Sequence, residues 1–304
     1  MKIILAGGTG FIGKPLTKNL LDCGHHVVLL TRQTHPDPES ENPRFQFQIW
    51  DAKNPGPWQK SLGGADAVIN LAGEGIAAKR WSTNQKKKIL DSRIDATRAL
   101  VEAIRHMSPR PKVLLNASAV GYYGNVPEGI MTEKSPCGAG FLAEVCHLWE
   151  KETLAAESAG LRVIRLRTGI VPEKEAGALS KMLFPFQFGL GGPLGSGTQW
   201  MSWIHRKDLI RIFLFLLENP GISGAVNAAA PHPVRMKEFA EALGKILRRP
   251  ALLPVPALAL RILLGELSSM LLKGQKVLPE KLLNHGFDFK YPDLEPALRA
   301  ILNK

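Results

Sequence analysis

The chain has 304 residues, of which 45% are hydrophobic, and a net charge of +12 from 39 basic and 27 acidic side chains. This length allows one large domain or two modest ones, and the composition excludes a disordered or fibrous chain. The positive charge favours anionic ligands, but the basic residues are too scattered for nucleic acid to be an expected partner.

The sequence indicates no metal site, leader or membrane span. The three cysteines form no spaced set, which suits a reducing compartment and excludes a cysteine-built zinc site. The first predicted strand begins at Lys2 and leaves no room for a targeting segment, so we expect a cytoplasmic protein. The most apolar region, residues 251–265, is interrupted by two prolines and Arg261, and we expect no membrane partner.

The predicted elements begin with a short apolar strand, a glycine-rich turn and a helix over residues 11–23. Gly8, Gly10 and Gly13 fit the dinucleotide fingerprint G-x-G-x-x-G, and Gly7 with the last two fits its near relative. The first glycine allows a tight turn, the second lets the backbone approach a pyrophosphate, and Gly13 lets the helix lie close to the strand. We expect the N-terminal amides of the helix to bind phosphate.

A second strand, Val27–Leu30, completes a βαβ unit and is followed by Thr31 and Arg32. Sites that prefer NAD usually place an acidic residue at the end of this strand, to accept hydrogen bonds from the ribose hydroxyls. Here the next acid is Asp37. Arg32 could pair with a 2′-phosphate instead, so we expect NADP rather than NAD, the alternative being an arginine at the surface without a partner.

Further strands alternate with loops and helices. Residues 33–44 predict a loop, and Phe45–Trp50 predicts a third strand that leads into Asp51. Asp51 could meet an adenine amino group or cap a turn, and the sequence leaves both open. A fourth strand begins at Ala67, and the small residues behind it would let a flat cofactor pass over the backbone.

The remaining elements define the fold class. A helix capped by Ser82 or Thr83 runs to about Met107, and strands over 113–118 and 162–167 flank a helix over about 141–159. This alternation predicts an α/β fold with a doubly wound parallel sheet of the Rossmann type. We expect residues 1–170 to form a dinucleotide-binding domain.

Residues 171–304 predict a smaller, α-rich domain on the substrate side of the strand ends. A return segment, about 200–228, is expected to rejoin the first domain with a helix and a strand near 225–228. The Gly-, Phe- and Trp-rich stretch 183–203 predicts loops that line a pocket. Helices are expected near 235–248, 257–272 and 293–302.

Three motifs together resemble the extended short-chain dehydrogenases/reductases. They are Gly7–Gly13, Asn70–Glu74 and Ser118–Gly124. More narrowly, the chain resembles the atypical branch called "epimerase family protein", some of whose members are labelled cell-division inhibitors. The segments 141–150, 189–197 and 272–279 carry this more specific likeness, and the resemblance extends from Met1 to about Asn303.

The resemblance implies a cofactor site. Residues 9–12 would hold the pyrophosphate, Arg32 the 2′-phosphate, Asp51 the adenine, and residues 72–74 the ribose side. The full set of candidate cofactor-binding residues is Gly7, Thr9, Gly10, Phe11, Ile12, Gly13, Thr31, Arg32, Asp51, Leu71, Ala72, Gly73, Glu74 and Arg93.

Active members of the family use Ser, Tyr and Lys, with the last two spaced Tyr-x-x-x-Lys on a helix. The lysine lowers the pKa of the tyrosine, which is about 10 when unperturbed. None of the three tyrosines in this chain has a lysine four residues later. Alignment on Glu150 places Leu142 and Cys146 at the Tyr and Lys positions, on a helix face that resembles a packing surface.

The remaining catalytic candidates are Ser118, Tyr122 and Tyr123, at and just beyond the end of the fifth strand. Each also has a structural interpretation: Ser118 as a small residue that satisfies a backbone group, and the tyrosines as loop packing. Cys146 is a weaker candidate, as a reactive thiol. We expect His205 and Asp208 to cap a helix and make interdomain contacts rather than to form a catalytic pair.

These observations predict an NADP-binding oxidoreductase or epimerase-like protein whose substrate is an unidentified small molecule, with nucleotide-linked compounds included. Hydride transfer would use the cofactor, while the protein supplies orientation and electrostatics. The alternative is a non-catalytic NADP(H)-binding regulatory protein, which the missing Tyr-x-x-x-Lys pair favours. A homodimer is compatible with either function.

Overall fold

The structure, a computed structural model, describes residues 1–32, 42–175 and 177–303, so most of the predicted 33–44 loop lies outside the described residues. The central sheet has the strand order β3-β2-β1-β4-β5-β7-β9, and every pairing in it is parallel. The strands are β1 Lys2–Ala6, β2 His26–Thr31, β3 Phe45–Ile49, β4 Ala67–Asn70, β5 Val113–Ala119, β7 Arg162–Thr168 and β9 Gly224–Ala228. The doubly wound parallel sheet is confirmed, and β9 comes from the predicted return segment.

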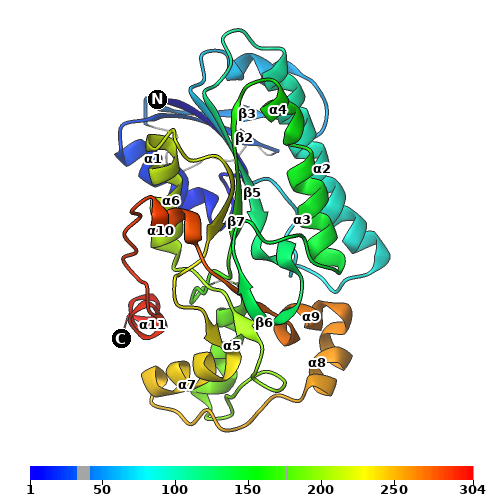
Figure 1. Cartoon of the computed structure of the whole chain (residues 1–304), viewed down its shortest axis with the longest axis vertical. Helices are drawn as coiled ribbons and strands as arrows, with labels where there is room; N and C mark the ends of the chain where they lie inside the picture. Colours follow the sequence, from blue (N-terminus) through cyan, green and yellow to red (C-terminus); the bar gives the residue numbers. More distant parts are fainter. Residues whose placement is uncertain (33–41, 176, 304) are drawn as a thin grey trace.

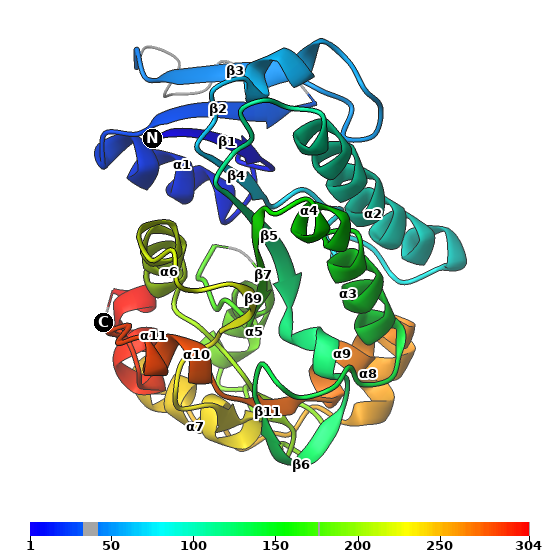
Figure 2. The ribbon, with the colours of Figure 1, turned by 45° about the horizontal axis from the view of Figure 1, so that its top comes forward.

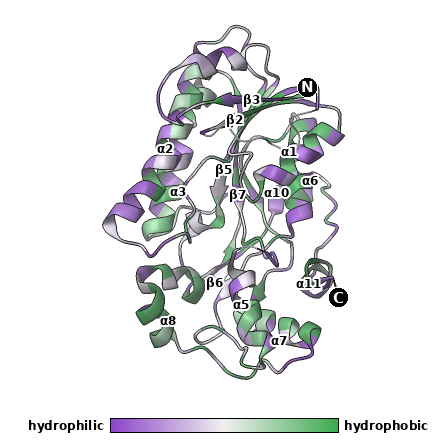
Figure 3. Ribbon diagram, turned by 180° about the vertical axis from the view of Figure 1, so that it is seen from behind, coloured by the Kyte–Doolittle hydropathy of each residue, from purple (hydrophilic) through white to green (hydrophobic). Residues whose placement is uncertain are grey.

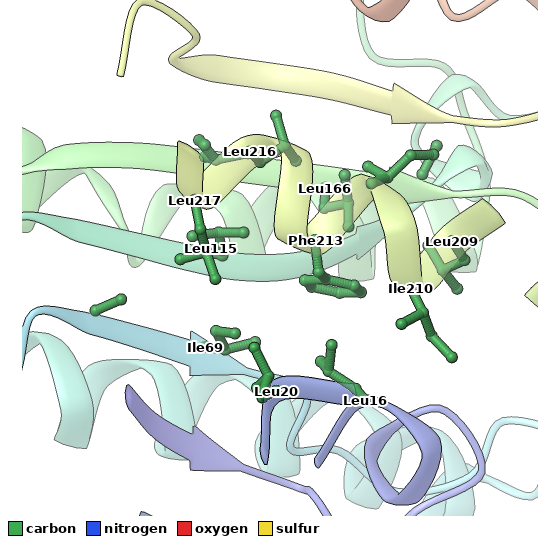
Figure 4. Close-up of a cluster of buried hydrophobic side chains, with 14 of the residues drawn as sticks. Leu16, Leu20, Ile69, Leu115, Leu166, Leu209, Ile210, Phe213, Leu216 and Leu217 are labelled. Carbon is green, nitrogen blue, oxygen red and sulfur yellow. The ribbon is translucent and has the colours of Figure 1, made fainter. Parts of the chain in front are cut away.

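Helices cover both faces of the sheet (Figures 1 and 2). One face carries α1 (Gly13–Asp22) and α6 (Arg206–Glu218). The other carries α2 (Thr83–Arg105), α3 (Phe141–Lys151) and α4 (Leu154–Ser158). Figure 4 shows how Leu16 and Leu20 of α1 and Phe213 of α6 meet the sheet residues Ile69 and Leu115. Burying each such side chain contributes about 1.5–3 kcal/mol, which explains why the strands are continuous apolar runs.

The predicted helix over about 141–159 is in fact two helices, α3 (Phe141–Lys151) and α4 (Leu154–Ser158). At the break, the Thr153 hydroxyl donates a 2.7 Å hydrogen bond to the carbonyl of Glu150. A side-chain bond of this kind competes with the helical backbone pattern. The start of α2 is as predicted, because the Ser82 hydroxyl accepts the amide of Gln85 at 3.2 Å.

The prediction of pocket-lining loops over 183–203 is wrong for its first part. Residues up to Gln187 belong to a helix, α5 (Gly177–Gln187), which contains Pro185. Pro185 argues against a helix in the sequence, yet the apolar residues around it have helical spacing. The side chains of Leu179, Met182, Leu183 and Phe186 are all buried in one core cluster.

The single helix expected over 257–272 is also divided. Gly265 has a φ of +61°, which ends α8 (Ala257–Leu264), and a 3-10 turn over Gly265–Ser268 separates it from α9 (Ser269–Leu272). The other C-terminal helices are α7 (Met236–Leu247), α10 (Glu280–Asn284) and α11 (Leu294–Leu302). Of these, α10 was not predicted.

Two small sheets join the C-terminal part to the rest. One pairs β8 (Trp200–Met201) with β10 (Val234–Arg235), and the other pairs β6 (Val126–Met131) with β11 (Gln275–Val277). Strands this short have too few residues to show a hydrophobic period. Figure 2 shows α5, α7 and β11 beyond the carboxyl end of β5, the edge at which open α/β sheets bind ligands.

Candidate functional site

The glycine turn after β1 is tightly packed at Gly7 and Gly13 and open at Gly10. Gly7 has a φ of +79°, and a Cβ there would lie 2.7 Å from the carbonyl of Leu71. A Cβ on Gly13 would collide with the carbonyl oxygen of Gly7 and the backbone of Gly8. On Gly10 it would meet only the carbonyl oxygen of Gly7, at 3.3 Å. The turn therefore needs Gly7 and Gly13 to fold, whereas the space beside Gly10 is open.

The N-terminus of α1 faces this opening without a compensating group. Ile12 is the N-cap residue, no side chain caps the helix, and no acidic residue lies in its first turn. The first amides of a helix lack intrahelical acceptors and carry part of the positive end of the helix dipole. With Thr9, Gly10 and Phe11 all exposed, this end of α1 has the chemistry of an anion site.

A positively charged side chain lies beside the loop after β4, whose Leu71 backbone packs on Gly7 of the turn. A Cβ on Gly73, in the loop after β4, would lie 3.2 Å from the side chain of Arg93. Arg93, from α2, donates to the carbonyls of Glu74 (3.0 Å) and Ile89 (2.9 Å), and its guanidinium lies 5.1 Å from the ring centre of Trp149.

Arg93 makes no ion pair with any residue that the structure describes. Burial lowers the pKa of its guanidinium. In the described part of the chain no carboxylate lies within ion-pair distance of it. The carboxylate of Glu74 instead accepts the Gln85 amide at 3.3 Å. A half-buried cation without an ion-pair partner in the described chain suits a negatively charged ligand.

The peripheral candidates lie further out. Arg32, after β2, is exposed and makes no ion pair with any residue that the structure describes, and Thr31 is half-buried. Asp51 accepts the amides of Lys53 (2.9 Å) and Asn54 (2.8 Å), and these bonds, with the Asn54 side chain, lower its pKa. Of its two interpretations the structure shows the turn, and the adenine contact stays a prediction. Phe11 packs beside the guanidinium of Arg206, which is 5.3 Å from the ring centre.

A row of polar side chains crosses the carboxyl ends of three neighbouring strands. Ser118 of β5 is in register with Arg167 of β7, which is in register with Asn227 of β9. Glu150 of α3 joins the row from above the sheet. It accepts the Ser118 hydroxyl at 2.7 Å and both the Nε and NH2 groups of Arg167 at 2.8 Å. All four side chains are buried.

The two candidate tyrosines extend this row. Tyr123 accepts a 3.0 Å hydrogen bond from Arg167 and donates a 2.6 Å bond to Asn227. It is 1% exposed, and burial raises its pKa to about 12. Tyr122 is half-exposed and its ring lies 3.4 Å from the guanidinium carbon of Arg167; burial also raises its pKa. The structure thus brings Ser118, Tyr122 and Tyr123 together, with Tyr122 the most accessible of the three.

Sequence reasoning missed Glu150, Arg167 and Asn227 as members of this centre. The hydroxyl of Ser118 neither satisfies a backbone group nor faces solvent, since its partner is the Glu150 carboxylate. A signal existed: β7 contains Arg162, Arg165 and Arg167 within an otherwise apolar strand, where charge is costly unless paired.

The weaker catalytic candidates have structural roles. Cys146 is buried on the α3 packing face, and burial raises the pKa of its thiol to about 12, so it is inert. The His205 ring caps α6 by accepting the amide of Lys207 at 3.1 Å, and it stacks on Tyr291. Asp208 accepts the amides of Lys290 (3.0 Å) and Tyr291 (2.8 Å). The predicted capping role is confirmed.

The fold and the glycine turn define a class: a Rossmann-type α/β protein whose candidate site lies between β1 and β4, where the chain crosses from one side of the sheet to the other. The chain belongs to the NAD dependent epimerase/dehydratase family, whose profile matches residues 3–229. Residues 255–301 match a domain of unknown function, DUF1731.

Named relatives confirm the expected "epimerase family protein" branch. The chain is 44% identical over 305 residues to the Arabidopsis thaliana protein "Epimerase family protein SDR39U1 homolog, chloroplastic", with 99% of this chain and 87% of that one covered. It is 42% identical over 303 residues to Bacillus subtilis "Epimerase family protein YfhF", with 99% and 98% covered.

The crystal structure of human epimerase family protein SDR39U1 (isoform 2) with NADPH superposes with a TM-score of 0.87 at 34% identity, over the whole of both chains. Within the described residues, no helix is long and apolar enough to cross a bilayer, and no group of three His, Cys, Asp or Glu side chains could hold a metal.

Proposed function

We propose that this protein binds NADP(H) at the carboxyl ends of β1 and β4 and is an oxidoreductase or epimerase-like protein acting on a small molecule. One observation carries the proposal: the uncapped N-terminus of α1 lies beside Gly10, and Arg93, which has no ion pair in the described chain, lies against Gly73 in the loop after β4, the loop whose Leu71 backbone packs on Gly7. Together they supply backbone amides and a half-buried cation for a pyrophosphate. The NADPH in the human relative's structure supports the same assignment.

The proposed roles follow from the positions of the residues. The amides of residues 9–12 and Arg93 would bind the pyrophosphate, and the loop after β4, residues 71–74, would border the ribose. Arg32 is exposed at the end of β2 with no acid bound to it in the described chain, and so would bind a 2′-phosphate. These contacts favour NADP over NAD, and residues 171–304 would form the substrate side.

When bound, the nicotinamide supplies or accepts a hydride. The chain's own contribution would come from the buried centre at the ends of β5, β7 and β9. Tyr122 is the half-exposed phenol of this centre, and we assign it as the proton donor to a substrate oxygen. The Arg167 guanidinium lies against its ring, and Glu150 fixes Arg167 and Ser118 in place. This arrangement provides acid–base chemistry without the Tyr-x-x-x-Lys pair, at a rate limited by the high pKa of the phenol.

A second candidate function is supported by α3. At the positions that active family members fill with Tyr and Lys, this helix carries Leu142 and a buried, inert Cys146. That substitution supports a non-catalytic regulatory protein in which NADP(H) controls contact with a partner.

The test is calorimetric titration of the purified protein with NADPH and NADH, followed by an assay of NADPH oxidation with a panel of carbonyl compounds and sugar nucleotides. NADPH binding tighter than NADH binding, with turnover of at least one compound, is the expected result. Binding without any turnover would favour the regulatory function. No binding of either nucleotide would overturn both.

A further inference from the structure

One end of the molecule exposes several large apolar side chains. Figure 1 places α5, α7 and α8 at the end opposite the N-terminus, and Figure 3 shows that α8 is strongly hydrophobic. The exposed apolar residues here, called the distal patch, are Phe184, Phe188, Leu190, Leu252, Leu253, Leu258, Ile262 and Leu263. Leu252 is 81% exposed, the largest fraction among the large exposed hydrophobic side chains of the described chain.

The segments of the distal patch are joined to one another. The rings of Phe184 and Phe188 are 5.0 Å apart at the end of α5. Beyond them, Leu253 donates its amide to the carbonyl of Gly191 at 3.3 Å, which ties the α7–α8 connection to the loop after α5. The connection leads directly into α8, whose outward face holds Leu258 and Ile262 one turn apart.

The two segments that form the distal patch carry charge of a single sign. Residues 177–200 and 242–265 contain no Asp or Glu. They contain five basic residues, of which only Lys245 makes an ion pair in the described chain, with Glu295 at 2.9 Å. The other four are Lys181, Arg248, Arg249 and Arg261, and all are exposed. On α5 and α8 a basic side chain stands beside apolar ones, as in Leu258, Arg261 and Ile262.

We propose that the distal patch binds peripherally to the surface of a lipid bilayer that contains anionic lipids. Apolar side chains that project between headgroups, beside Lys and Arg that pair with lipid phosphates and carboxylates, are the two components of interfacial binding. The proposal revises our expectation of no membrane partner, which rested on the lack of a spanning segment.

The charge pattern selects this occupant over others. A second copy of the chain, docked patch to patch, would bring together the four basic side chains of each copy that make no ion pair in the described chain, on segments that contain no Asp or Glu. Nucleic acid would satisfy the cations but leave the aliphatic side chains of α8 without apolar contact. An anionic bilayer satisfies both sets of side chains.

The experiment is co-sedimentation of the full chain with extruded vesicles of phosphatidylcholine alone or with 30% phosphatidylserine. We expect at least tenfold stronger partitioning onto the anionic vesicles, and a decrease as salt is raised. Two double variants test the components separately: Leu252→Ser with Leu258→Ser, and Lys181→Glu with Arg261→Glu. Each should weaken binding about tenfold or more.

Matched controls change equivalent side chains away from the distal patch. Phe47→Ser with Leu154→Ser removes two exposed apolar residues, and Lys60→Glu with Lys88→Glu makes the same change in net charge. Both controls should bind like the unchanged protein, and thermal melting should show that all variants are folded. The proposal is overturned if the unchanged protein binds neither vesicle, or if the controls lose binding as strongly as the patch variants. It is also overturned if the patch variants instead dissociate an oligomer in light scattering.

Discussion

Arg167 directs two guanidinium nitrogens at the two carboxylate oxygens of Glu150, at 2.8 Å each, and both side chains are almost completely buried. Such a pair is costly to desolvate, so it adds little to stability compared with an apolar pair of the same shape. Removing one member, however, leaves the other charge buried and unpaired. The pair therefore holds the polar centre in one arrangement: Glu150 orients Ser118, and Arg167 holds both tyrosines.

The first prediction concerns this pair. Glu150→Gln keeps the shape of the side chain but leaves the charge of Arg167 uncompensated, and should lower the free energy of unfolding by about 3–5 kcal/mol. The matched control is Glu152→Gln, two residues later, which breaks an exposed pair with Arg98 and should cost less than about 1 kcal/mol. Urea denaturation of both variants measures the difference. If both variants lose the same free energy of unfolding, burial of the ion pair does not determine the cost of breaking it.

The second prediction concerns the glycine turn. Gly10→Val should fold, with one tight contact of its Cβ to the carbonyl oxygen of Gly7 at 3.3 Å, but it should lose NADPH binding because its side chain would occupy the space required by the pyrophosphate. Gly13→Ala should instead destabilise the protein, since its Cβ collides with backbone atoms of Gly7 and Gly8. Thermal melting and calorimetry on the two variants separate these effects. A folded Gly10→Val that retains NADPH affinity would contradict the proposed site.

The third prediction concerns cofactor choice. Arg32→Ala should reduce the preference for NADPH over NADH by about 1.5–3 kcal/mol, the contribution of a hydrogen bond between charged groups. It should leave the affinity for NADH nearly unchanged. Arg105→Ala, which removes an exposed arginine at the far end of α2, is the control. If the unmodified protein binds both nucleotides equally, the assignment of Arg32 is wrong.

Sequence patterns predicted the sheet because β1, β2 and β4 are apolar runs and β3 alternates apolar and polar residues. They predicted the turn because close packing at Gly7 and Gly13 requires glycine at those two positions. They could not reveal the polar centre in the same way. Glu150 and Asn227 are separated by 77 positions, and only the register of β5, β7 and β9 brings their partners together. The predicted helix boundaries were wrong where a single residue set them, as with Pro185 inside α5 and Gly265 after α8.

The fourth prediction is a pH dependence from His205. Burial lowers the pKa of this ring to about 4 in the folded protein, from about 6.5 when unfolded. Between these two pH values the unfolded state binds the proton more tightly than the folded state does. The free energy of unfolding is therefore at its full value above pH 6.5, where His205 is neutral in both states, and it decreases as pH falls towards 4. The loss should be on the order of 1–3 kcal/mol. His205→Asn can still cap α6 but does not titrate, so its melting temperature should fall less over this range than that of the unchanged protein. If the melting temperatures of the two proteins fall equally between pH 6.5 and pH 4, His205 is not the cause of the loss.

The last prediction separates the two tyrosines. Tyr123 is enclosed, with its hydroxyl bonded to Arg167 and Asn227, so Tyr123→Phe should chiefly lower stability, by about 1–3 kcal/mol, because it leaves buried polar groups without a partner. Tyr122 is half-exposed, so Tyr122→Phe should leave stability nearly unchanged and lower any turnover by about 10²–10⁴-fold.

Because burial raises the pKa of Tyr122, its phenol stays protonated near neutral pH. Reduction, which needs a proton donor, should therefore be nearly independent of pH around neutrality, whereas oxidation, which needs the phenolate, should accelerate as pH rises. The measurement is the pH–rate profile of the unchanged protein in both directions, with the two variants and Ser118→Ala assayed beside it. If turnover survives Tyr122→Phe but is abolished in a folded Tyr123→Phe, the acid–base role passes to the buried tyrosine. If it survives in all three variants, the chemistry lies outside this centre.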